Sequence, residues 1–132
     1  MILDTNAVSA LFAGDPALGS VLAGEPRLHV PVVVIGEYRY GLARSNRRRS
    51  LARLLETLIA ESRVLEIDRE TAERYAEVRD ELRRKGTPIP ENDVWIAALA
   101  RQHELTVVTR DEHFDQIPGL ERRSWCVRGR GF

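Results

Sequence analysis

Little in this 132-residue sequence points to an oxidising or membrane environment. Cys126 is the only cysteine, so no internal disulfide can form, which is typical of proteins in a reducing cytoplasm. No apolar run reaches the ~18 residues that a membrane-spanning helix needs. The first residues also lack the pattern of a secretory signal. We therefore expect a single cytoplasmic domain, residues 1–132, with no membrane segment.

An excess of charge of one sign is also absent. The chain has 20 basic and 20 acidic residues, so its bulk charge does not predict a nucleic-acid partner. Lysine is nearly absent, because Lys85 is the only one. Five arginines nevertheless cluster with no acid among them, namely Arg44, Arg47, Arg48, Arg49 and Arg53. Guanidinium groups bind phosphate oxygens in a bidentate manner, so the cluster is a candidate phosphate-binding surface, and the alternative is the solvated start of a helix.

Short apolar segments alternate with helical patterns along the chain. The expected strands are residues 2–3, 28–30, 64–67, 106–109 and 124–127. The expected helices are one through residues 8–12, capped by Thr5 or Asn6, and others at about 17–23, 31–43, 48–62, 69–85 and 91–103. Such alternation is typical of parallel βαβ units. The predicted fold class is therefore α/β, a three-layer α/β/α sandwich with a central, mostly parallel sheet, followed by a loose basic tail at 128–132.

Residues 32–35 form the most ambiguous segment. Three valines and an isoleucine favour a strand by intrinsic propensity. However, Val34, Tyr38 and Leu42 recur at helical spacing, and Pro31 suits the first turn of a helix. We therefore predict a helix, which places Glu37 beside its apolar face.

Four carboxylates stand out from these local patterns. Asp4 and Asp111 directly follow two apolar segments that we expect to be strands. Glu37 lies beside the apolar face of one expected helix, and Asp93 opens another. Acidic side chains are rarely buried unless they are paired or bind a metal. If the fold brings the four together, they repel one another and need a cation, and an all-oxygen ligand set favours Mg²⁺ or Mn²⁺ over Zn²⁺.

Each acid also has an ordinary explanation when it is taken alone. Asp4 can be a helix cap and Asp111 can start a turn. Asp93 can favour a helix dipole, which is worth ~0.3–1 kcal/mol. Glu37 becomes a surface residue if its helix is rotated. The three histidines have no HxxxH or similar spacing, so we do not expect any of them to be a ligand.

Taken together, these positions resemble the PIN-domain nucleases, and more narrowly the VapC-type toxins of bacterial toxin–antitoxin pairs. The resemblance covers nearly the whole chain and rests on four motifs in this order and spacing. They are residues 2–6 (ILDTN), Glu37, residues 92–98 (NDVWIAA) and residues 108–111 (VTRD). The resemblance implies a PIN-like fold with an intact acidic site.

The resemblance also implies roles for individual residues. The implied catalytic acids and metal ligands are Asp4, Glu37, Asp93 and Asp111. The implied cofactor is Mg²⁺, with Mn²⁺ as a substitute. The implied supporting residues are Asn6, Thr109 and, as an outer acid, Asp115. For Asp115 the alternative is a turn residue.

The implied activity is that of an endoribonuclease, the toxin of a type II toxin–antitoxin pair. It would hydrolyse RNA phosphodiester bonds, and Arg44, Arg47, Arg48 and Arg49 would hold the RNA backbone. VapC-type proteins usually form homodimers and are held inactive by a VapB-type antitoxin. RNA, an antitoxin and a second copy of the chain are therefore the expected partners.

Other classes of protein fit less well. A receiver domain also carries acids at strand ends, but it needs a lysine after a late strand, and Lys85 ends a charged helix instead. A non-catalytic PIN-like binding module would not need all four acids. A structure-specific DNA nuclease remains an alternative, although the chain has no added segments with which to clamp DNA.

Overall fold

The computed structural model describes residues 1–125, which form a five-stranded sheet in the order β3-β2-β1-β4-β5. All four neighbouring pairs of strands are parallel. The strands are short, and they are β1 (Ile2–Leu3), β2 (His29–Pro31), β3 (Arg63–Leu65), β4 (Val107–Val108) and β5 (Arg122–Arg123).

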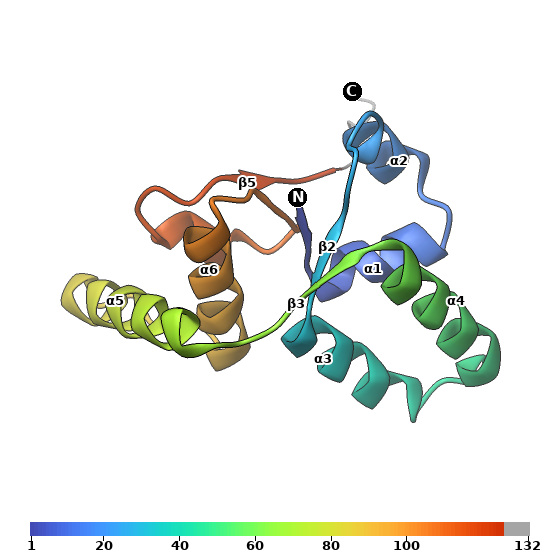
Figure 1. Ribbon diagram of the computed structural model, residues 1–132, viewed down its shortest axis with the longest axis horizontal. Coiled ribbons are helices and arrows are strands. Elements are labelled where there is room, and N and C mark those ends of the chain that lie inside the picture. The colour runs from blue at the N-terminus through green and yellow to red at the C-terminus, as the bar shows by residue number, and fades with distance from the viewer. Residues whose placement is uncertain (126–132) are drawn as a thin grey trace, which may run out of the picture.

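Helices cover both faces of this sheet (Figure 1). They are α1 (Thr5–Phe12), α2 (Pro16–Leu22), α3 (Val32–Leu42), α4 (Arg48–Glu61), α5 (Arg69–Lys85) and α6 (Glu91–His103), followed by the short 3₁₀ helix η1 (Glu112–Gln116). In Figure 1, α1, α2 and α4 lie on the right of the sheet, α3 runs from below the strands to the lower right, and α5 and α6 lie on the left. The predicted three-layer α/β/α fold class is therefore confirmed.

The topology determines where a site can form. From β1 the chain moves outward to β2 and then β3, whereas β4 and β5 add to the opposite side of β1. Right-handed crossovers then place the first helices and the later ones on opposite faces of the sheet. The direction changes between β1 and β4, and ligands of open α/β sheets bind outside the carboxyl ends of the strands at such a point.

The central strands are completely buried. Ile2, Leu3, Val107 and Val108 have no exposed surface, as expected for parallel strands that are covered on both faces. The segment that follows β4 is anchored by Phe114, which is also fully buried. The residues just beyond β1 and β4 are therefore held on a rigid support.

Helix α3 begins directly where β2 ends, which confirms the helical interpretation of residues 32–35. Pro31 is the last residue of β2 and the N-cap of α3. Val34, Tyr38 and Leu42 are buried along one face of the helix. Burial of this stripe outweighs the strand propensity of the valines, because packing commonly overrides intrinsic preference.

Several predicted element boundaries were wrong. Asp4, rather than Thr5 or Asn6, caps α1. The third strand begins and ends earlier than 64–67, and the last strand is Arg122–Arg123 rather than 124–127. Pairing with β4 decides the position of the last strand, because the Thr109 N–H donates to the carbonyl of Arg123 over 3.0 Å. Residues 126–127 and the predicted tail at 128–132 lie outside the described residues. Among the described helices, none is both long and apolar enough to cross a membrane.

Candidate active site

Four acidic side chains meet at the carboxyl edge of the sheet, next to the point where its topology changes direction. Asp4 directly follows β1, and Asp111 lies three residues beyond β4. Asp93 lies in the first turn of α6, and Glu37 lies in the middle of α3. Elements separated by more than a hundred residues of sequence thus contribute to one site.

Asp4 is the most deeply placed of the four, with only 5% of its surface exposed. Its Oδ1 accepts a hydrogen bond from the Thr5 N–H over 2.8 Å, and its Oδ2 accepts one from the Thr109 hydroxyl over 2.7 Å. Burial raises the pKa of Asp4 above its usual range, and the negative charges of Glu37 and Asp111 raise it further. The protein thus holds a carboxylate where a negative charge is costly.

Thr109 is fully buried and links the first and last acidic segments. Its hydroxyl donates to Asp4 and accepts from the Asp111 N–H at 3.0 Å and the Asn6 amide at 3.2 Å. The other end of the Asn6 side chain accepts from the Arg110 N–H at 3.2 Å. One donated and two accepted bonds use the full capacity of a hydroxyl group, so Thr109 fixes the relative positions of Asp4 and Asp111.

Glu37 joins the site through Thr5. Its Oε1 accepts from the Thr5 hydroxyl over 2.9 Å, while the Thr5 N–H binds Asp4. Glu37 is only partly buried, so its second oxygen remains available to solvent or to a ligand. Thr5 is a site residue that the sequence analysis assigned only to helix capping.

Asp93 and Asp111 converge on the ring of His113. The Nδ1 atom of His113 lies 3.1 Å from Asp93 Oδ2 and 2.8 Å from Asp111 Oδ1. Burial, together with the charges of Asp4 and Asp111, raises the pKa of Asp93 to about 6. The hydrogen bond with Asp93 raises the pKa of His113. The imidazole therefore partly offsets the negative charge of the two acids.

These same three residues can hold a metal ion. One ligand atom from each of Asp93, Asp111 and His113 lies within 4.8 Å of the others. Asp4 lies close enough for its charge to raise the pKa of Asp93. Neighbouring carboxylates at a buried edge fit a hard divalent cation, because such a cation prefers oxygen ligands and removes their repulsion.

His113 is a second residue of the site that the sequence did not predict. Its signal is local but weak, since it lies two residues after Asp111 with no second histidine at metal-binding spacing. The short helix η1 begins at Glu112, and Asp111 caps it by accepting from the His113 N–H over 3.0 Å. This cap turns the ring back towards Asp93.

Asp115 and Arg110 lie in other surroundings. Asp115 forms two hydrogen bonds of 2.8 and 2.9 Å with the guanidinium of Arg122, which hold its pKa below the usual range. The side chain of Arg110, the only basic neighbour of Asp111 in sequence, binds the Trp125 carbonyl instead and stacks on that ring. Neither side chain contacts the four acids.

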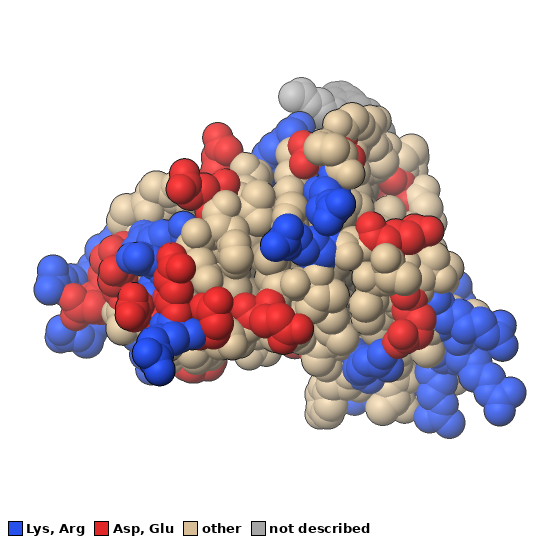
Figure 2. All heavy atoms as spheres, in the orientation of Figure 1, with Lys and Arg blue, Asp and Glu red and all other residues tan. Residues whose placement is uncertain are grey.

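The predicted arginine cluster extends from the turn after α3 into the first half of α4, and all five of its side chains are exposed. Figure 2 shows basic side chains gathered at the lower right, where Figure 1 places this turn. Among residues 1–125, none of the five lies within 4.0 Å of a carboxylate, whereas Arg74, Arg79, Arg83 and Arg84 of α5 are all ion-paired. The cluster is thus an uncompensated positive surface.

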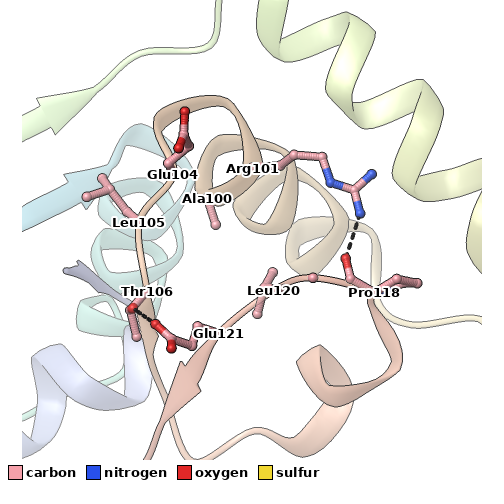
Figure 3. A pocket seen from close by; sticks show the side chains of 9 residues that line it. Ala100, Arg101, Glu104, Leu105, Thr106, Pro118, Leu120 and Glu121 are labelled. Carbon is pink, nitrogen blue, oxygen red and sulfur yellow. Dashed lines mark hydrogen bonds between the residues drawn. The ribbon is translucent and has the colours of Figure 1, made fainter.

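A separate hollow of about 440 Å³ lies at the opposite, amino end of β4 (Figure 3). Its polar groups already bind one another, since Arg101 donates to the Pro118 carbonyl and Thr106 donates to Glu121. None of the four acids lines this hollow. The acidic edge is therefore the site with unsatisfied chemistry.

Comparison with known proteins agrees with this geometry. The family model described as the PIN domain matches residues 1–120, which include all four acids and His113. The chain belongs to the PIN-domain family.

Individual relatives narrow the assignment to VapC-type proteins. The chain is 33% identical over 101 residues to the tRNA(fMet)-specific endonuclease VapC of Salmonella typhimurium, covering 76% of each chain. It is 32% identical over 120 residues to ribonuclease VapC5 of Mycobacterium tuberculosis, covering 89% of this chain and 87% of that one.

Solved structures show the same likeness. The chain matches the crystal structure of VapBC2 from Rickettsia felis bound to a promoter DNA fragment, with a TM-score of 0.84 and 26% identity. The match covers 95% of this chain and 98% of that one. It also matches DNA-bound VapBC from Salmonella typhimurium, with a TM-score of 0.84 and 29% identity, covering 95% and 97% of the two chains.

Proposed function

We propose that this protein is a Mg²⁺-dependent endoribonuclease, the toxin of a type II toxin–antitoxin pair. The observation that carries the proposal is the convergence of Asp4, Glu37, Asp93 and Asp111 at the carboxyl edge of the sheet. The relatives named as VapC ribonucleases support RNA as the substrate. An RNA substrate in turn implies that the protein acts in the cytoplasm.

The metal site would be formed by carboxylates together with His113. Asp93 and Asp111 would be ligands, with Asp4 and Glu37 ligating directly or through water, and His113 either ligating or turning aside. Mg²⁺ is the proposed ion and Mn²⁺ a substitute, because oxygen ligands suit both and an imidazole is better accepted by Mn²⁺. When bound, the ion activates water and neutralises charge on the phosphate.

The protein's own groups would orient the reactants. Glu37, with one oxygen held by Thr5 and the other free, would position the attacking water at the scissile phosphate. Thr109 and Asn6 would keep Asp4 and Asp111 in a fixed relation, so that little reorganisation is needed during the reaction. The proposed role of Asp115 is outer support through Arg122, whose guanidinium also donates to the Thr109 carbonyl.

The arginine cluster would bind the RNA backbone. Arg44, Arg47, Arg48 and Arg49 are exposed and have no carboxylate partner among the described residues. Phosphate contacts of this kind contribute affinity without reading sequence. These arginines follow α3, which is the helix that carries Glu37. An RNA strand bound to them could therefore reach the acidic edge of the sheet.

The proposed partners follow from the same relatives. Several similar structures are described as VapBC complexes, so we propose a VapB-type antitoxin as the inhibitor of this chain. We also propose a homodimer as its assembled form.

Cleavage of RNA should require a divalent ion. Purified protein is expected to cut a mixed single-stranded RNA pool with Mg²⁺, to cut it with Mn²⁺, and to be inactive with EDTA, because unshielded carboxylates repel the phosphate. Gel analysis and sequencing of the cut ends measure this. Single-stranded DNA of the same sequences is the control. Preferential cleavage of DNA, or RNA cleavage that survives EDTA, would contradict the proposal.

Loss of the Thr109 hydroxyl should weaken catalysis without removing a ligand. Thr109→Val is nearly isosteric, but it leaves Asp4 and Asn6 without their shared hydrogen-bond partner. Loss of a residue that supports metal ligands typically lowers activity by about 10- to 100-fold, so we expect a loss of this size in kcat. Thr109→Ser should restore most of the rate. Equal rates for the valine variant and the wild type would show that the hydroxyl does not position the acids.

A further inference from the structure

Tyr40 is the most exposed of the large apolar side chains among the described residues, with 69% of its surface accessible. The next two, Leu54 and Ile67, are each 40% exposed. Exposure of a single aromatic ring is common and means little by itself. What distinguishes Tyr40 is its position relative to the acidic site and its contact with Arg44.

Tyr40 lies on the same side of α3 as Glu37. The two residues are three positions apart, so they are neighbours on the helix surface. Glu37 is tied to Thr5, and Thr5 is tied to Asp4. Tyr40 therefore lies about one helical turn along α3 from Glu37, on the side where α3 leads towards the arginine cluster.

The ring is held in place by Arg44. The Arg44 guanidinium donates to the Tyr40 hydroxyl over 2.9 Å, and its central carbon lies 5.1 Å from the ring centroid. Arg44 has no carboxylate partner within 4.0 Å in the described part of the chain, so this contact determines where its charge lies. An exposed ring and an uncompensated guanidinium thus stand side by side next to the site.

We propose that Tyr40 is a substrate-positioning residue that stacks on an unpaired base of the RNA strand, while Arg44 binds the adjacent phosphate. The inference rests on the proposed ribonuclease function and adds to it the side chains that would hold one unpaired nucleotide. Single strands are held by aromatic stacking combined with a basic path along the backbone. A base within a duplex is already stacked on its neighbours, so a paired strand could not use Tyr40. An apolar protein partner would gain little from the uncompensated charge of Arg44, which favours RNA as the occupant.

The test compares Tyr40→Phe, Tyr40→Leu and Tyr40→Ala. Stacking of one base on an aromatic ring is worth about 1–3 kcal/mol, which corresponds to about a 5- to 150-fold change in affinity. The leucine and alanine variants should therefore raise KM by a factor in that range. Tyr40→Phe should stay close to the wild type because it keeps the ring. RNA carrying 2-aminopurine at successive positions around the cut site, bound to the inactive Asp4→Asn protein, should show quenching at one position. That quenching should disappear when Tyr40→Leu is added.

Controls separate this inference from the proposed function and from folding. Leu54→Ala, at an exposed apolar position on α4, should leave KM unchanged. Absence of RNA cleavage by the wild type would refute the proposed function. Cleavage by the wild type with equal KM and equal quenching in Tyr40→Leu would overturn the role of Tyr40, even if that variant bound an antitoxin or a second copy more weakly. If the leucine variant does not fold, unchanged quenching in a folded Tyr40→Ala variant would overturn the role as well.

Discussion

Replacing Asp4 by asparagine is expected to abolish RNA cleavage while leaving the metal-free protein at least as stable as the wild type. Without this carboxylate, the metal should stabilise the transition state less by several kcal/mol, which corresponds to a rate at least about 10³-fold lower. The fold should not suffer, because Asp4 is a buried charge surrounded by other acids, and its pKa is raised mainly by burial. Asparagine removes the charge and keeps one oxygen for the cap of α1. The Thr109 hydroxyl can donate to Asn6 Oδ1, 3.4 Å away, instead.

Two measurements check this expectation. Initial rates on RNA give the loss of activity, and thermal unfolding in EDTA gives the change in Tm. Asp80→Asn is a matched control, because Asp80 lies on α5 and pairs with Arg83 and Arg84 at the surface. Wild-type activity of the Asp4→Asn protein would refute the catalytic role. A Tm well below that of the wild type in EDTA would show that Asp4 is chiefly structural.

Metal affinity should fall steeply below about pH 6. A metal ligand must be deprotonated, and the pKa of Asp93 is raised to about 6 in the metal-free protein. Below that pH, protons compete with Mg²⁺, and the affinity should drop about tenfold per pH unit for the one carboxylate. Calorimetric titration with Mg²⁺ at pH 5, 6 and 7.5 measures this. Equal affinity at pH 5 and pH 7.5 would contradict the assignment of Asp93 as a ligand.

In the metal-free protein, the raised pKa of Asp93 makes the fold more stable as the pH falls, whereas it weakens metal binding. Because the folded pKa of Asp93 lies above its unfolded value of 3.8, the folded state binds the extra proton. Stability from this group therefore rises as pH falls through about 6 towards 4, and is lost above pH 6. In EDTA, Asp93→Asn should be more stable than the wild type at pH 7.5, by on the order of 3 kcal/mol, and this difference in stability should disappear near pH 4. Urea unfolding at the two pH values checks the sign.

Local patterns predicted most of the fold because they act over a few residues. The apolar stripe of α3 overcame the strand propensity of its valines. Local residues also define the expected helix at 69–85, because Asp68 caps its start and Gly86 ends it in the left-handed conformation. Alternation of such segments was enough to predict a parallel sheet. The same reasoning failed at the last strand, because its position depends on pairing with β4 and not on its own residues.

The four acids could be recognised one at a time, but their surroundings could not. The resemblance placed them in one site, and the structure adds the contacts that hold them there. Thr109 and Asp4 are 105 residues apart, yet they share a hydrogen bond of 2.7 Å. His113 lies 20 residues from Asp93, and no spacing rule links the two. Asp115, a candidate outer acid in the sequence, is directed towards Arg122.

By itself, the sequence determined the order of helices and strands, the α/β class and the residues that can carry negative charge into the core, because these depend on local periodicity and on side-chain chemistry. Only the tertiary structure decided which partner each charged group receives. The imidazole of His113 lies between Asp93 and Asp111, and the Asp115 carboxylate faces Arg122. Among residues 1–125, the arginine cluster that begins at Arg44 has no carboxylate within 4.0 Å. The reason is physical: an ion pair or a metal site depends on a few ångströms of separation, and that separation is set by strand order and crossover direction.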